Sequence, residues 1–113
     1  MKEFLMLIRE NAKYGELSVE AMQADIQEHI NWVETLVEKG NFKSGNPLNS
    51  GGVTLKGSVV TDGPYVETKE CISGYYFLLA NSLDEVKEIA KDCPDLKRGA
   101  TLEIREIINT DEA

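Results

Sequence analysis

The side chain best suited to acid–base chemistry in this sequence is His29, its single histidine. A free imidazole has a pKa of about 6.5, so it can donate or accept a proton close to neutral pH. His29 lies three residues after Ile26 and four before Val33, at the edge of an apolar stripe with helical spacing. This position suits two roles: a proton-transfer group in a cleft, or a half-buried histidine with structural hydrogen bonds.

An acid–base histidine is usually oriented by a carboxylate, and Asp62 is a candidate for that partner. Asp62 opens the sequence Asp62-Gly-Pro64, where an aspartate commonly forms a turn by binding a nearby backbone N–H. If the carboxylate instead reaches His29, it orients the ring and favours the imidazolium form. Both interpretations stay open from the residues alone.

Six further residues could bind a substrate beside such a pair. They are Trp32, Gly63, Pro64, Tyr65, Lys69 and Tyr75. Trp32 lies three residues from His29 on the same helix flank, so it could form a pocket wall or cover the helix–sheet seam. The tyrosines suit core or dimer packing with a hydroxyl that reaches the cleft, and Lys69 suits a lid or a charged surface loop.

The elements that must position these residues follow from periodicity and turn signals. We predict, in chain order, a strand at Phe4–Ile8, a helix from the N-cap Ser18 to Gly40, a short strand near Phe42, a hairpin turning at Lys56-Gly57, a strand at Tyr75–Ala80, a helix capped by Ser82 and Glu85 that ends before Pro94, and a last strand from Thr101 to about Ile108. We expect the apolar stripe of the first helix to face the sheet.

This order predicts an α+β fold of the ferredoxin-like, split β-α-β type with an added hairpin, in which both helices cover one face of an antiparallel sheet. We expect one domain at residues 1–108 and a polar tail at 109–113. The strands at Phe4–Ile8 and Tyr75–Ala80 are apolar at every position, so the second sheet face also needs cover. A second copy, sheet against sheet, would supply it as a dimeric α+β barrel; the alternative is an apolar surface.

Composition limits the classes of function. The chain has 113 residues, with 12 basic and 20 acidic side chains and a net charge of −8, which disfavours nucleic acids and anionic membranes. The first apolar run is too short for a signal peptide or a membrane span. Cys71 and Cys93 form no metal or redox motif, so we expect reduced thiols and a cytoplasmic location. We find no sequence motif for a metal or a cofactor, and we predict none.

Several segments together resemble a known family. They are the run Val60–Glu70, Ser73-Gly-Tyr-Tyr76, Ser82-Leu-Asp-Glu85, Cys93-Pro94 and Leu102-Glu-Ile-Arg105. This pattern resembles the YCII-related domain family, and within it the branch named for an Asp-Gly-Pro-Phe signature, although Tyr65 stands where the signature has phenylalanine. The resemblance implies a ferredoxin-like fold and a dimeric α+β barrel.

A second resemblance concerns the candidate site. The stretch from His29 to Gly40, followed by Gly45-Asn-Pro-Leu48, is similar to another YCII branch, in which a helix histidine and a nearby acid form an active-site pair. That resemblance implies His29 for the histidine, and either Asp92 or Asp62 for the acid.

The family has no general function, so three hypotheses follow. The first is a small cofactor-free enzyme that isomerises, eliminates from or hydrolyses a small organic molecule. The second is a non-enzymatic homodimeric module that binds a small molecule or a protein in a regulatory role. The third is a purely structural dimer.

Overall fold

The computed structural model describes residues 1–11, 18–49, 51–62 and 70–110. The strands are β1 (Lys2–Asn11), β2 (Phe42–Pro47), β3 (Val53–Lys56), β4 (Val59–Asp62), β5 (Glu70–Ala80) and β6 (Thr101–Glu106). The helices are α1 (Val19–Glu38), α2 (Leu83–Ala90) and the short 3-10 helix η2 (Pro94–Arg98). In the part of the chain so described, no helix is long and apolar enough to cross a membrane.

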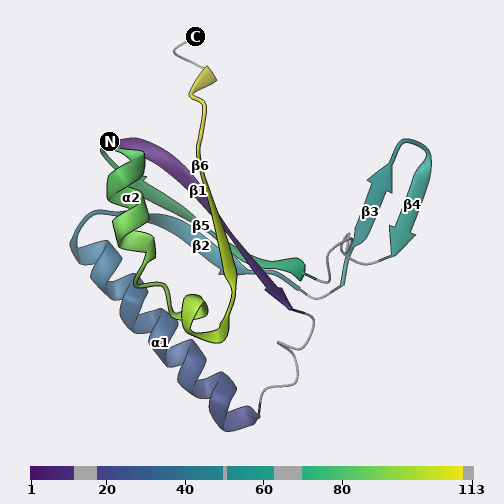
Figure 1. Cartoon of the computed structure of the whole chain (residues 1–113), viewed down its shortest axis with the longest axis horizontal. Coiled ribbons are helices and arrows are strands. Elements are labelled where there is room, and N and C mark those ends of the chain that lie inside the picture. The colour runs from purple at the N-terminus through teal and green to yellow at the C-terminus, as the bar shows by residue number, and fades with distance from the viewer. Residues whose placement is uncertain (12–17, 50, 63–69, 111–113) are drawn as a thin grey trace.

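Four strands form one sheet in the order β2-β5-β1-β6, and every neighbouring pair is antiparallel. Figure 1 shows α1, α2 and η2 on the same face of this sheet. This arrangement confirms the predicted ferredoxin-like α+β fold. The predicted hairpin is also present: β3 and β4 pair with each other as a separate two-stranded sheet, which extends away from the main sheet in Figure 1.

Both long helices begin where the sequence predicts them. The Ser18 hydroxyl accepts a hydrogen bond from the Ala21 backbone N–H at 3.1 Å, which satisfies a donor at the start of α1. At α2, Ser82 accepts from the Glu85 N–H at 3.1 Å, and the Glu85 carboxylate accepts from the Asn81 N–H at 3.1 Å. This is a variant of the capping box, because the Glu85 carboxylate bonds the N–H of the residue before the N-cap and not that of the N-cap Ser82.

The core lies between the sheet and the helices. Alternate residues of the two central strands point to the helices, because side chains alternate between the faces of a strand. The buried members are Phe4, Met6 and Ile8 of β1 and Tyr76, Leu78 and Ala80 of β5. Their neighbours Leu5, Leu7, Tyr75, Phe77 and Leu79 are only partly buried on the opposite face.

The buried side of α1 differs from the predicted apolar stripe. Trp32, Leu36 and the charged Asp25 are buried, whereas Ile26 and Ile30 are 55% and 46% exposed. The expectation that the whole stripe packs on the sheet was therefore wrong. Ile26 and Ile30 instead line a cavity, which keeps them accessible while they remain next to the core.

Candidate functional site

A cavity of about 630 Å³ lies between α1 and the end of the sheet formed by β1, β2 and β5. One wall consists of apolar side chains from α1, namely Ile26, Ile30 and Val33. Tyr76 of β5 faces the same cavity, and its ring fits closely against Gly45 of β2. A Cβ atom at Gly45 would lie 2.5 Å from the Tyr76 ring, so only glycine leaves room for the tyrosine here.

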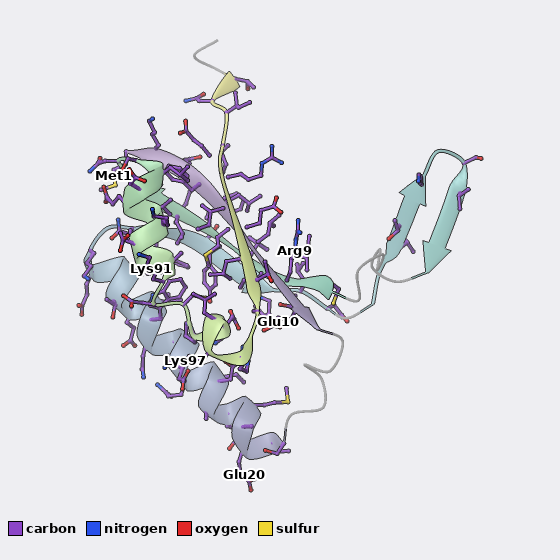
Figure 2. The ribbon with its side chains drawn as sticks, in the orientation of Figure 1. Met1, Arg9, Glu10, Glu20, Lys91 and Lys97 are labelled. Carbon is purple, nitrogen blue, oxygen red and sulfur yellow. The ribbon has the colours of Figure 1, made fainter. Side chains whose placement is uncertain are left out.

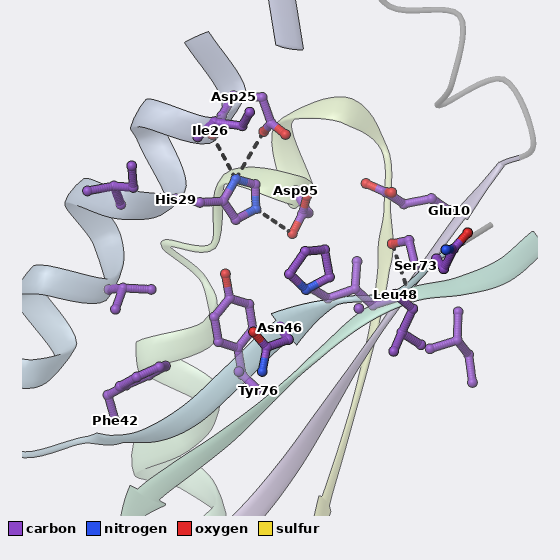
Figure 3. A pocket seen from close by; sticks show the side chains of 18 of the residues that line it. Glu10, Asp25, Ile26, His29, Phe42, Asn46, Leu48, Ser73, Tyr76 and Asp95 are labelled. Atoms are coloured by element: carbon purple, nitrogen blue, oxygen red, sulfur yellow. Dashed lines mark hydrogen bonds and ion pairs between the residues drawn. The ribbon is translucent and has the colours of Figure 1, made fainter. Parts of the chain in front are cut away.

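His29 lies on the α1 side of this cavity and is held at both ring nitrogens (Figure 3). Its Nε2 atom is 2.9 Å from Oδ2 of Asp95. Its Nδ1 atom is 2.8 Å from the backbone carbonyl oxygen of Asp25 and 3.1 Å from that residue's carboxylate. Because each nitrogen faces an oxygen acceptor, the arrangement suits an imidazolium ring that donates from both positions.

Local structure at η2 places Asp95 opposite His29. Pro94 begins this helix, and a proline is suited to a first helical position because it lacks a backbone N–H. The left-handed Gly99 (φ 83°) ends the helix, and the Ala100 N–H then bonds to the Asp95 carbonyl oxygen at 3.1 Å. The Asp95 side chain is 4% exposed, so its carboxylate is held inside the protein at the cavity wall.

Arg98 joins three carboxylates from three different elements. Its guanidinium contacts Asp25 of α1 through Nη1, and Asp95 of η2 through Nη2. The same Nη2 atom lies 3.3 Å from Oε1 of Glu10 in β1. A planar guanidinium can bind several carboxylates at once, so Arg98 compensates buried negative charge and links the walls of the site. By contrast, Lys97 (labelled in Figure 2) is 74% exposed at its side chain and lies 3.9 Å from Glu28 on the surface of α1.

The surroundings shift the pKa values of this cluster. The hydrogen bond to Asp95 raises the pKa of His29 to about 9, and this effect outweighs burial, which acts in the opposite direction. Burial raises the pKa of Asp95, but the hydrogen bond and charge of His29, together with the charge of Arg98, bring it below its ordinary value. At neutral pH the pair is therefore an imidazolium and a carboxylate.

Cys93 lies beside Asp95 but is poorly suited to act as a nucleophile. Its Sγ atom is 3.5 Å from Oδ2 of Asp95. Burial raises the pKa of the Cys93 thiol to about 12. A thiol with so high a pKa stays protonated at neutral pH and reacts slowly.

Among the described residues, Asp95 and not the predicted Asp92 is the acid that contacts His29 Nε2. Asp92 is exposed in the turn before η2, whereas Asp95 within η2 is directed inward to His29. Asp62 pairs with Val53 in the β3–β4 hairpin, and its side chain lies outside the described part of the structure. The predicted substrate-binding residues Gly63, Pro64, Tyr65 and Lys69 also lie outside the described residues.

Trp32 and Tyr75 occupy structural positions. Trp32 is buried, and its ring packs edge-on against Tyr76 with centroids 5.3 Å apart. Tyr75 lies on the open face of the sheet, edge-on to Phe77, and its hydroxyl accepts a hydrogen bond from Asn46 at 3.3 Å. Neither side chain is among the described residues that line the cavity.

Four residues of the cluster were not predicted from the sequence: Glu10, Asp25, Asp95 and Arg98. Two spacings could have indicated part of the cluster: Asp25 precedes His29 by four residues on one helix, and Arg98 follows Asp95 by three. Glu10 continues the inward-facing positions of β1, two residues after Ile8.

Asp25, His29 and Asp95 each place a possible metal-ligand atom within 4.8 Å of the others. Two carboxylates and an imidazole suit several divalent cations. However, Arg98 contacts both carboxylates, and its positive charge would repel a cation held by the same groups. The donors therefore fit a hydrogen-bonded, charge-compensated cluster better than a metal site.

Comparisons with known proteins agree with the fold. A family model, the YCII-related domain, matches residues 4–111. No curated protein matches the sequence. Among solved structures, the chain is similar to 5-chloro-2-hydroxyhydroquinone dehydrochlorinase (TftG) from Burkholderia phenoliruptrix AC1100, in complex with 2,5-dihydroxybenzoquinone, with a TM-score of 0.59, 17% identity and 97% of each chain covered. At this level of identity, the likeness shows a shared fold.

Proposed function

This chain belongs to the YCII-related domain family, and we propose that it is a small enzyme that needs no cofactor and uses His29 and Asp95 as an acid–base pair on a small organic substrate. The observation that carries the proposal is the 2.9 Å contact between His29 Nε2 and Asp95 Oδ2 at the wall of a cavity. A positioned acid–base group of this kind contributes a rate factor of about 10² to 10⁴.

In this proposal His29 acts first as a general acid. The imidazolium gives a proton to a developing oxyanion or to a leaving group, and Asp95 keeps the ring oriented during the transfer. The ring regains its charge by taking up the proton that the substrate loses in an isomerisation or elimination, or that the attacking water loses in a hydrolysis. Isomerisation, elimination and hydrolysis all use such a cycle, and the name of the structural neighbour, a dehydrochlorinase, favours elimination.

A non-enzymatic binding module with a regulatory role is the second candidate, and one observation favours it. Both nitrogens of His29 contact protein oxygens, so the ring must exchange a protein contact for a substrate contact before it can transfer a proton. A module would use the same cavity without this rearrangement, because it requires binding alone.

Replacement of His29 separates these two functions. Chloride release from 5-chloro-2-hydroxyhydroquinone and related halogenated phenols would be measured for wild type, His29→Gln and Asp95→Asn. We expect a loss of about 10²-fold or more in each variant, with Glu88→Gln, an exposed change on α2, as the matched control. Turnover that survives both changes contradicts the acid–base pair, whereas saturable binding without turnover supports the module.

We also propose that the chain is a homodimer that pairs as an α+β barrel. The support is the open face of the sheet, where apolar side chains are only partly buried: Leu5, Leu7, Tyr75, Phe77 and Leu79. A second copy would cover this face. Light scattering should give the mass of a dimer for wild type and of a folded monomer for Phe77→Asp; a wild-type monomer at micromolar concentration would rule the dimer out.

Two finer assignments belong to the proposal. Asp62-Gly-Pro-Tyr65 supports membership of the Asp-Gly-Pro-Phe branch, and a sequence tree that places the chain elsewhere would contradict it. Both cysteines are free thiols, which is common in the reducing cytoplasm. Recovery of the protein from another compartment in cell fractionation would contradict a cytoplasmic location.

A further inference from the structure

A third acidic side chain, Glu10, lines the same cavity and has no part in the proton transfer proposed above. Glu10 lies near the end of β1, just after the shift in strand register between Ile8 and Arg9. The residue is 5% exposed, and Figure 3 shows its carboxyl group directed toward the side of the cavity where Asp95 lies. Glu10 is therefore placed to contact a bound molecule.

The cluster around Glu10 holds more negative than positive charge. His29 and Arg98 supply two positive charges, and Asp25, Asp95 and Glu10 supply three negative ones when all are ionised. Both nitrogens of His29 already contact Asp25 and Asp95. Glu10 is 3.3 Å from an Arg98 nitrogen that also serves Asp95, so its charge is the least compensated of the three.

The pKa of Glu10 agrees with this assignment. Burial raises it, the negative charge of Asp95 raises it further, and the contacts with Ser73 and Arg98 offset these effects only in part. A buried carboxylate in this situation gains from a ligand that donates a hydrogen bond to it.

The rest of the described cavity lining contains no lysine or arginine side chain that would attract an anion. Glu34 adds a further acidic side chain to the lining. Among the described residues that line the cavity, His29 alone can carry a positive charge, and its two nitrogens are occupied. Apolar side chains form much of the remaining wall, and they make the desolvation of an anion costly.

We infer that Glu10 is a ligand-binding residue, and that it makes the cavity select small, uncharged, largely apolar molecules that carry a hydrogen-bond donor, and reject anions. The ligand would place its donor against the Glu10 carboxylate and its apolar part against Ile26, Ile30 and Val33. The inference rests on the proposed function in that it assigns the substrate class to the same cavity, but it requires binding only.

Three probe ligands share one aromatic ring and differ in their polar group. 4-Methylbenzyl alcohol is neutral and donates a hydrogen bond, 4-methylbenzyl methyl ether is neutral and has no donor, and 4-methylbenzoate is an anion. Dissociation constants would be measured by titration calorimetry on the full chain near pH 7. We expect the alcohol to bind about tenfold more tightly than either the ether or the benzoate, the effect of one buried hydrogen bond or one uncompensated charge.

Two substitutions of Glu10 then test the two parts of the selectivity. Glu10→Gln removes the charge but keeps an acceptor, so the benzoate should gain about tenfold relative to the alcohol. Glu10→Met removes the acceptor as well, so the alcohol should lose its advantage over the ether. Glu3→Gln is the matched control, because it makes the same charge change on the same strand outside the cavity.

Several results would overturn the inference: equal binding of the three probes, tightest binding of the benzoate, no binding of any probe, or an unchanged order in a folded Glu10→Gln variant. Thermal unfolding of each variant shows whether it is folded. Failure of the proposed function is a separate result, because it appears as turnover retained in His29→Gln, whereas this test reads affinity alone.

Discussion

The two halves of the space between helices and sheet have opposite chemistry. Next to α2, Phe4, Leu78 and Val86 are 0% exposed and pack without charged partners in the apolar core. Next to the N-terminal half of α1, Asp25 and Asp95 are 7% and 3% exposed and border an open cavity. The same sheet face therefore carries a closed apolar region and a polar, accessible one.

The change from one region to the other occurs along a single strand. The inward positions of β1 are Phe4, Met6, Ile8 and then Glu10. The first three fill space against the helices, whereas the fourth needs charged and hydrogen-bonding partners, which cannot pack as densely as apolar side chains. The site therefore forms where the apolar pattern of β1 ends at Glu10, while the closed region supplies the hydrophobic part of the stability.

The largest expected effect is on the closed region. Leu78→Ala should lower the free energy of unfolding by about 2–5 kcal/mol, because it leaves a cavity where the side chain was fully buried. Urea unfolding measures this loss. If the two regions are separable, the pKa of His29 in this variant should stay near 9, which ring NMR signals would report.

A change in the pKa of His29 comparable to that caused by Asp95→Asn would show that the regions are coupled. The separation would then be one of composition alone, and the closed region would also set the electrostatics of the site.

The next largest effect is expected at Arg98. Arg98→Met leaves the carboxylates of Asp25, Asp95 and Glu10 without their shared cation, and we expect a loss of about 2–4 kcal/mol. This range is set below that of a fully buried ion pair, since the Arg98 side chain is 23% exposed. Urea unfolding again gives the value.

Arg98→Lys is the matched control for this substitution. It keeps the positive charge but not the planar fork, so it should recover part of the stability. A loss in Arg98→Met no larger than that of an exposed pair, such as Lys91 with Glu88, would mean that the cluster is stable without its cation.

The elements that form the closed region could be predicted from the sequence, whereas the residues of the site could be predicted only in part. Continuous apolar runs, turn residues and capping residues are local signals, and they predicted the central strands, both helix starts and the ferredoxin-like order. His29 stood out because it is the single histidine. Its partner did not, because the inward direction of Asp95 depends on the turn of η2 and on a contact with His29, which lies 66 positions away in the chain.

The stripe on α1 shows the same limit in another form. Helical spacing identified Ile26 and Val33 as members of one face, but spacing cannot distinguish a face that packs on a sheet from one that borders a cavity. That distinction depends on where β2 and β5 end, which is a property of the tertiary structure.

The smallest expected effect is the dependence of stability on pH that the polar region contributes. The pKa of His29 is raised to about 9 in the folded state, above the value of about 6.5 expected in the unfolded state. The resulting stabilisation is complete below pH 6.5 and is lost as the pH rises through 9, and it amounts to about 3 kcal/mol. Urea unfolding at several pH values between 6 and 9 should show this decline, and His29→Gln should remove it.

Asp95→Asn should shift the decline to lower pH, because it removes the hydrogen bond that is the main cause of the raised pKa of His29. Measurements above pH 9 are less informative, since the buried Cys93 thiol, with a pKa of about 12, also begins to favour the unfolded state there. A wild-type stability that does not change from pH 6 to pH 9 would mean that His29 gains nothing from Asp95 in the folded protein, and that the polar region differs from the closed one in accessibility alone.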